Sequence, residues 1–177
     1  MIYFLIALLL IIAIILVMAF TGDQNLNIAR EITINKPRQS VYDFIKLMGN
    51  QKHYSKWVMA DPNAKMTMEG TDGTIGAISS WDSQNKQVGK GSQEISSMVE
   101  GQRVDWALRF LEPMESNQTA SMSLESLSDN QTKVTWTYGG PMKFPMNVMN
   151  VILNIKKLLG NELDLSLNNL KAYLENQ

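Results

Sequence analysis

Few side chains in this sequence have the types and spacing needed for chemistry. His53 is the only histidine, and the chain has no cysteine. Zinc sites built from paired histidines or thiolates are therefore excluded. Any catalytic pair of a serine nucleophile and a histidine base would have to use His53. No Gly-x-Ser-x-Gly turn is present to carry a serine nucleophile. We expect His53 on the loop after the first helix of the domain, with a position at a pocket mouth as its functional alternative.

Two carboxylates, Glu94 and Asp105, fall in segments with a strand pattern. Either could act as a general acid or base if an apolar cavity raised its pKa. Asp105 alternates with Trp106, whose side of the strand is apolar, so we expect Asp105 at the surface, beside Arg103 or Arg109. Glu94 and His53 remain the candidate catalytic residues. The sequence predicts no cofactor and no metal.

Aromatic and methionine side chains are the candidates for the wall of a ligand site. Tryptophan and tyrosine bury large apolar areas while keeping a polar group for a ligand, and methionine adapts to irregular shapes. The same residue types also fill ordinary cores. The candidate ligand-binding residues are Trp57, Trp81, Trp106, Met122, Trp136, Tyr138, Phe144 and Met149.

These residues must be positioned by strands, which the alternation of apolar and polar residues predicts. The clearest segment is 103–110, where every second residue is apolar and its neighbours include Arg103, Asp105 and Arg109. Such a pattern is typical of a half-buried antiparallel strand. Further segments, separated by turn-forming residues, bring the expected number of strands to about six or seven. They are 28–34, 66–69, 75–81, 88–99, 120–124 and 134–138.

Helical spacing appears before and after this series of strands. Pro37 begins a short amphipathic segment that ends at Gly49. From 148 to 174 apolar residues recur every three or four positions, which predicts one long helix with Pro145 near its start and a bend at Gly160. This order predicts an α+β fold in which a curved antiparallel sheet wraps the C-terminal helix. Because the sheet is wider than one helix, an apolar cavity can remain between them.

The first twenty residues, which begin with Met1 and end with Phe20, are all apolar. That length can cross the hydrocarbon core of a bilayer, so residues 1–22 are predicted as a membrane anchor, 23–27 as a tether and 28–177 as one domain. A cleaved signal peptide is the alternative, although no Lys or Arg precedes the apolar segment. The side of the membrane that holds the domain and the oligomeric state stay open.

The charges of the chain are balanced. The formal net charge is −1, from 16 basic and 17 acidic residues that are mixed along the sequence. Such a chain offers no broad positive field for a polyanion. Nucleic acid is therefore not expected as a partner.

Several fragments of the sequence occur in an order and spacing that match one family. They are 32–37, 41–44, Trp57, Gly76, Trp81, 89–92 with Ile95, 132–136, and 167–171 before Leu174. Together they resemble the polyketide cyclase/dehydrase-like branch of the START-like (SRPBCC) superfamily. The resemblance extends over residues 28–175 and implies a helix-grip fold with a cavity for lipids, polyketides, steroids or other hydrophobic molecules. It is not specific for a reaction. Some similar proteins also carry an N-terminal hydrophobic segment.

We therefore expect a single-pass membrane protein whose domain binds a hydrophobic small molecule or lipid between the sheet and the C-terminal helix. Catalysis is not required for this function. The first alternative is a cyclase-like or hydrolase-like enzyme that uses Glu94 or His53 as acid or base, which requires an inward-facing ionisable group. The second alternative is a stress-response or interaction module with a filled core.

Overall fold

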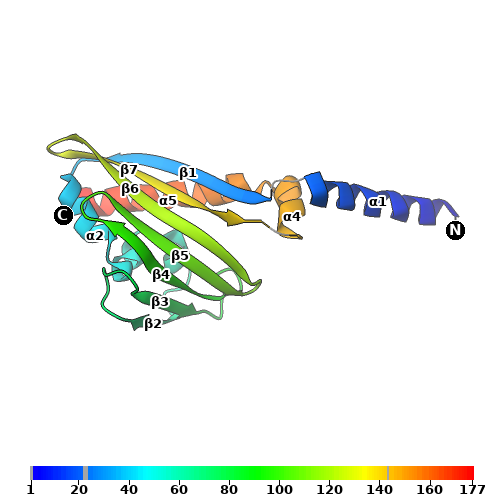
Figure 1. Ribbon diagram of the computed structural model, residues 1–177, viewed down its shortest axis with the longest axis horizontal. Coiled ribbons are helices and arrows are strands. Elements are labelled where there is room, and N and C mark those ends of the chain that lie inside the picture. Colours follow the sequence, from blue (N-terminus) through cyan, green and yellow to red (C-terminus); the bar gives the residue numbers. More distant parts are fainter. Residues whose placement is uncertain (1, 22–23, 143) are drawn as a thin grey trace.

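A computed structural model describes residues 2–21, 24–142 and 144–177 of the chain. An N-terminal helix, α1 (Ile2–Thr21), extends away from a domain built on one antiparallel sheet (Figure 1). The strands are β1 (Asn25–Ile34), β2 (Lys65–Glu69), β3 (Ile78–Asp82), β4 (Lys90–Val99), β5 (Arg103–Glu112), β6 (Ser116–Ser128) and β7 (Gln131–Pro141). The helices of the domain are α2 (Arg38–Ile45), η1 (Met48–His53), α3 (Lys56–Met59), α4 (Met146–Leu153) and α5 (Ile155–Glu175).

The seven strands lie in the order β1-β7-β6-β5-β4-β3-β2. Each strand from β2 to β7 pairs with its neighbour in sequence, and β1 closes the order by pairing with the last strand, from Asn25 opposite Pro141 to Ile34 opposite Thr132. The helix α5 packs along β1 on one face of this curved sheet (Figure 1). The predicted α+β helix-grip fold is confirmed.

Alternating burial defines the inner face of the sheet. Val104 and Trp106 on β5 are buried, whereas Arg103 and Ala107 are exposed, as the sequence pattern predicts. On α5 the buried residues recur at helical spacing, and each fully buried leucine contributes about 1.5–3 kcal/mol of apolar burial. These leucines, which meet the inner face, are Leu163, Leu167, Leu170 and Leu174.

Polar contacts fix the position of α5 along β1. Arg30 Nε lies 2.9 Å from Asp164 Oδ2, and Lys171 Nζ donates to the carbonyl of Thr33 at 2.7 Å. Gly160 lies within α5, which is continuous from Ile155 to Glu175. A Cβ at position 160 would stand 2.1 Å from Arg30 Nη2, so the glycine leaves room for the arginine.

The predicted single C-terminal helix is in fact two helices, divided at Asn154. The backbone of Asn154 is left-handed, with φ 49° and ψ 55°, a conformation that asparagine tolerates better than most residues. Its side chain accepts a hydrogen bond from Lys157 N at 3.2 Å and so caps α5. Because of the break, Ile152 is 66% exposed instead of facing the sheet.

Smaller differences concern the element ends. The strand β1 begins at Asn25, inside the 23–27 segment that the sequence assigns to a tether, of which residue 23 lies outside the described part. The first helix of the domain ends at Ile45, and the segment after it, where the sequence allows a loop or short helical turns, holds η1 and α3. Gly76 and Gly89, with φ of 86° and 64°, turn the chain just before β3 and β4, so both strands begin later than predicted.

The helix α1 is long and apolar enough to cross a membrane, with a mean hydropathy of 3.3 over Ile2–Ala19, a property that a signal sequence shares. Near its C-terminal end it is bonded to the domain. Asn147 Nδ2 and Gln24 Nε2 donate to the carbonyl of Ala19 at 2.7 and 3.0 Å. These donors satisfy a carbonyl that the end of a helix leaves without an intrahelical partner.

Replacing Asn154 with alanine is expected to destabilise the domain by roughly 1–2 kcal/mol, because the cap is lost and the left-handed backbone becomes strained. Asn154→Gly relieves the strain and should cost only a few tenths of a kcal/mol. The measurement is urea unfolding of the full-length protein in one detergent. Equal losses for the two variants would contradict the role of the left-handed backbone.

Candidate functional site

An aromatic cluster covers part of the inner face of the sheet. We define it as Tyr54, Trp57, Trp136 and Tyr138. Tyr54 and Trp57 meet the Trp136 ring edge-on, at centroid distances of 5.9 and 6.2 Å, and Trp57 stacks on Tyr138 at 6.4 Å. The sheet supplies two of these rings and the η1–α3 segment the other two. The cluster therefore joins the sheet to the short helices that cover it.

Helix α5 holds the η1–α3 segment in place. The hydroxyl of Ser166, which is buried, accepts from Lys56 N at 2.9 Å and donates to the carbonyl of Glu162 at 2.8 Å. Asn169 Nδ2 donates to the carbonyl of Tyr54 at 3.4 Å. Two polar side chains on α5 thus set where Tyr54 enters the interior.

Strands β5 and β6 extend the aromatic surface. Trp106 lies opposite Ala120, which in turn lies opposite Tyr138, so a small side chain separates two large rings. In the next row Met122 lies opposite Trp136. Neighbouring strands are about 4.8 Å apart, so Trp106 and Tyr138 flank the alanine at roughly twice that spacing.

Four hydrogen-bond donors of the core have no hydrogen-bond partner among the described residues. One is the hydroxyl of Tyr42 on α2, and the other three are the hydroxyl of Tyr54 and the Nε1 atoms of Trp106 and Trp136. The side chains of these three are buried, with exposed fractions of 0, 2 and 6%. An unpaired buried polar group costs about 1–3 kcal/mol, so three in one apolar interior are unusual.

Burial also changes the acidity of the tyrosines. It raises the pKa of Tyr54 well above the ordinary value, with a smaller contribution from the charge of Asp72. Burial raises the pKa of Tyr138 to about 12. For Tyr42 the causes are burial and then the charge of Glu100, which raise its pKa to about 12. All three side chains are therefore neutral hydrogen-bond donors at physiological pH.

Neither of two hollows on the described surface is lined by Trp106, Trp136 or Tyr138. These three side chains are buried or half-buried between the sheet and α5. One hollow, of about 240 Å³, is largely apolar and lies between η1, α3 and strands β2 and β3, with Met48, Val58, Met66 and Met68 in its wall. The other, of about 490 Å³, is polar and includes Asp61, Lys65 and Asp82.

The apolar hollow and the aromatic cluster lie on two sides of one short helix. Val58 of α3 lines the hollow, and the preceding residue, Trp57, belongs to the cluster. No side chain of α3 is fully buried. The short helix α3 thus separates the surface hollow from the interior.

The predicted ligand-binding residues separate into two groups. The structure brings together Trp57, Trp106, Met122, Trp136 and Tyr138, all of which belong to the core or pack against it. Of the remaining three, Trp81 lies apart on β3, where its ring meets Phe110 edge-on at 5.7 Å and its Nε1 donates to the Val88 carbonyl at 3.4 Å. The other two are Phe144, which is 65% exposed just before α4, and Met149, which is 38% exposed within α4.

The candidate catalytic residues do not meet each other. Glu94 is exposed on the outer face of β4, because it alternates with the buried Ile95. His53 is half-buried and stacks on Tyr173 at a centroid distance of 4.4 Å. Asp105 pairs with Arg103 at 3.0 Å, as the sequence suggested. Across the described ranges no group of three His, Cys, Asp or Glu side chains could hold a metal ion.

Sequence reasoning missed Tyr54 and a buried pair of glutamines. Gln51 Nε2 donates to Gln93 Oε1 at 3.1 Å, and Gln93 Nε2 donates back to Gln51 Oε1 at 2.8 Å. Gln93 is two residues from Ile95, so strand parity could have placed it inside. The segment that carries Gln51 and Tyr54 has no periodicity that reveals which side chains point inward.

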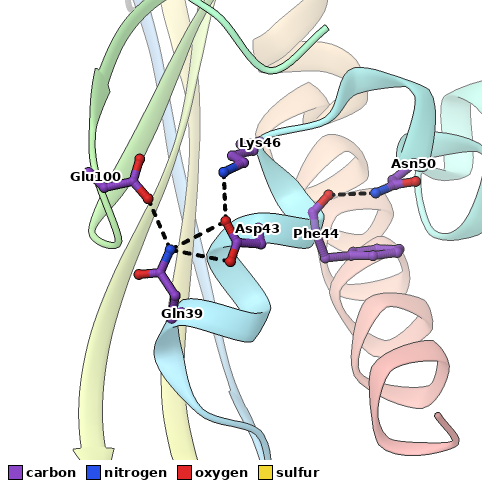
Figure 2. Close-up of polar contacts among 6 residues, drawn as sticks. All are labelled: Gln39, Asp43, Phe44, Lys46, Asn50 and Glu100. Atoms are coloured by element: carbon purple, nitrogen blue, oxygen red, sulfur yellow. Dashed lines mark hydrogen bonds and ion pairs between the residues drawn. The ribbon is translucent and has the colours of Figure 1, made fainter.

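Helix α2 closes one end of the interior and is held by contacts at its outer side (Figure 2). Gln39 Nε2 donates to Glu100 Oε1 on the β4–β5 turn at 2.9 Å, and Lys46 Nζ lies 2.6 Å from Asp43 Oδ1. The hydrogen bond from Lys46 lowers the pKa of the Asp43 carboxyl. Asn50 Nδ2 donates to the backbone carbonyl of Phe44 at 2.9 Å (Figure 2). These contacts position α2.

Comparison with known proteins supports the fold. No protein-family model and no curated protein matches the chain. A Thermobifida fusca protein solved by NMR is 15% identical, with a TM-score of 0.62 over 82% of this chain and 90% of that one. DynU16, from the dynemicin biosynthetic locus, is 13% identical, with a TM-score of 0.60 over 86% of this chain and 48% of that one.

The crystal structure of Ara h 8.0201 is 12% identical, with a TM-score of 0.57 over 86% of this chain and 99% of that one. At such identities a likeness shows the fold alone. With its seven-stranded antiparallel sheet and long C-terminal helix, the chain has the Bet v 1-like helix-grip fold.

Above a pH of about 10, the free energy of unfolding is expected to fall as the pH rises. The unfolded chain releases tyrosine protons near the ordinary pKa of 10.0, whereas the pKa values of Tyr42 and Tyr138 are raised to about 12 in the folded protein. Between these values the unfolded state binds fewer protons, so deprotonation favours unfolding. Urea unfolding at several pH values between about 9 and 11 measures the slope. A slope unchanged by Tyr138→Phe would contradict the assignment.

The paired glutamines should be energetically coupled. Gln93→Leu alone leaves the buried Gln51 amide unpaired and is expected to cost about 2–3 kcal/mol, and Gln51→Leu should behave alike. The double variant should cost less than the sum, because no amide is then left without a partner. A double-mutant cycle from urea unfolding gives the coupling energy. Strict additivity of the two losses would mean a coupling energy of zero and would contradict the prediction.

Proposed function

We propose that this chain is a membrane-anchored binding protein for a hydrophobic small molecule or lipid, held between the sheet and α5. The observation that carries the proposal is the set of unpartnered donors on Tyr54, Trp106 and Trp136 in an otherwise apolar interior. A filled, purely structural core would be more stable without them.

The donors define the kind of ligand. An indole N–H can only donate, and the neutral Tyr54 hydroxyl can donate as well, so the complementary group is an acceptor such as a carbonyl, ether or carboxylate oxygen. The walls around the donors are aromatic and thioether groups, which suit a large apolar body. The ligand class is therefore an amphiphile with one acceptor-rich end, and the resemblance to polyketide cyclase-like sequences supports the same class.

Entry to the interior requires movement, because core side chains occupy the space. In this proposal the ligand first occupies the apolar hollow beside Val58 and then displaces α3, the single-turn helix that separates the hollow from the interior. A helix of four residues without a buried side chain opens at low cost in free energy. Trp136 then moves aside, and its indole gains an acceptor.

The helix α1 supplies the membrane anchor in this proposal. Its described side chains are exposed or half-buried along the whole helix, and the window Ile2–Ala19 holds no charged residue. Such a surface is stable in hydrocarbon and unfavourable in water. An anchor keeps the binding domain where lipids and other hydrophobic molecules are concentrated. The alternatives that require catalysis by Glu94 or His53 gain no support, since neither side chain points into the interior.

The experiment is to purify the full-length protein in lipid nanodiscs, extract it with organic solvent and identify small molecules by mass spectrometry. Empty nanodiscs made from the same membranes are the control. We expect an amphiphile enriched in stoichiometric amount with the protein. Its repeated absence from protein made in several hosts would overturn the binding proposal in favour of an interaction module.

Tyr54→Phe separates binding from stability. Without ligand the variant should be as stable as the parent or more stable by about 1 kcal/mol, because an unpaired buried hydroxyl is removed. The amount of ligand retained per protein should fall by roughly tenfold, since its acceptor loses a partner. Tyr173→Phe, on the ring that stacks on His53, is the matched control. A large loss of stability for Tyr54→Phe would show that the hydroxyl has a structural partner instead.

A further inference from the structure

The helix α4 presents an apolar face to the outside. Ile152 and Leu153 are 66 and 59% exposed, Met149 is 38% exposed, and Phe144, just before the helix, is 65% exposed. Side chains three and four positions apart lie on one side of a helix, so Met149, Ile152 and Leu153 share a face. Contiguous apolar surface of this kind marks an interaction site.

Other side chains of α4 fix the helix to the domain. Asn147 and Val148 are 1 and 6% exposed, and Met146 packs against the core. After the turn at Asn154, Lys156 N donates to Asn150 Oδ1 at 3.1 Å, which ties the start of α5 to α4. The outward direction of the apolar face is thus set by the fold.

The position of α4 relates this face to α1. Asn147 Nδ2 donates to the carbonyl of Ala19, the last residue of the apolar window Ile2–Ala19, and α4 lies beside that end of α1 (Figure 1). Eighteen helical residues rise about 27 Å, close to the ~30 Å thickness of a hydrocarbon core. If α1 spans the bilayer, α4 stands at the level where the span ends.

The charge around α4 suits lipid headgroups. Residues 141–161 contain three lysines and no acidic residue. Lys157 is exposed at the start of α5, just beyond the apolar face. A short apolar face followed by basic residues is typical of helices that lie in the interface of a membrane with anionic lipids.

We infer that α4 is a second membrane contact: its apolar face lies in the headgroup–acyl boundary of the bilayer, beside the point where α1 leaves it. This inference rests on the proposed anchoring by α1. The two contacts hold the domain in one orientation on the membrane, because the connection between α1 and the sheet is short. Gln24 Nε2 donates to the carbonyl of Ala19, and β1 begins at Asn25.

Spin labels on single cysteines test the inference, and the natural absence of cysteine makes each label unique. The full-length variants Ile152→Cys and Leu153→Cys are reconstituted in vesicles of phosphatidylcholine with a minority of phosphatidylglycerol. Collision with oxygen, which enters lipid, is compared with collision with a water-soluble nickel complex. The matched control is Leu127→Cys, an apolar residue that is 49% exposed near the β6–β7 turn, at the other end of the sheet. Leu9→Cys reports the depth of α1.

We expect the ratio of oxygen to nickel accessibility at residues 152 and 153 to exceed that at 127 several-fold, and to be lower than at residue 9. Water-like ratios at 152 and 153 with a deep label at residue 9 would overturn the inference and leave the anchor intact. A water-like label at residue 9 would overturn the anchor itself. Strong dipolar broadening between labels at 152, with low oxygen access, would show that a second copy covers the face, and would also overturn the inference.

A charged variant gives an independent test. Ile152→Asp, combined with a label at Met149→Cys, should lose the high oxygen accessibility of the Met149→Cys label alone, because a carboxylate is not held below the headgroups. Leu127→Asp with the same label is the control and should leave the ratio unchanged. An unchanged ratio in Ile152→Asp would overturn the inference.

Discussion

The pairing of β1 with β7 is the constraint on which the rest of the structure depends. It joins the beginning of the domain to the end of the strand series, and α5, which follows the closing strand after α4, packs along β1. The leucines of α5 then meet the inner face, and the contacts of Arg30 and Lys171 fix the position of the helix along β1. Once α5 is placed, Ser166 and Asn169 position the segment that carries Tyr54 and Trp57.

The interior formed in this way is mainly apolar, but it also contains hydrogen-bond donors. Rings from β5, β7 and the η1–α3 segment line it, and three of these rings carry donors without partners among the described residues. The paired Gln51 and Gln93 show that the same fold can satisfy a buried polar group when a partner is supplied. The contrast is the physical basis for treating the aromatic interior as a ligand site whose occupant brings the acceptor.

The end of the domain that carries α1 is organised by other contacts. At Ala19 the apolar helix α1 meets α4, and the left-handed Asn154 turns the chain so that α4 leaves the line of α5. A continuous helix would have directed Ile152 toward the sheet. The break instead gives the domain an apolar face at the end of α1. Phe144 and Met149, which the sequence suggests as pocket residues, belong to that face.

By itself the sequence determined the repeating parts of this protein. Period-two alternation in 103–110 and helical spacing from 155 to 174 report burial directly, so the sheet, α5 and the inward side of Trp106 and Trp136 could be predicted. Tertiary structure alone decided what depends on contacts between distant segments. Tyr54, Gln51 and the break at Asn154 lie in stretches whose local pattern allows several conformations, and packing against α5 or α1 selects one. Whether a cavity remains between the sheet and α5 also could not be decided from the sequence, because side-chain volumes add up only after strands and helix have been brought together.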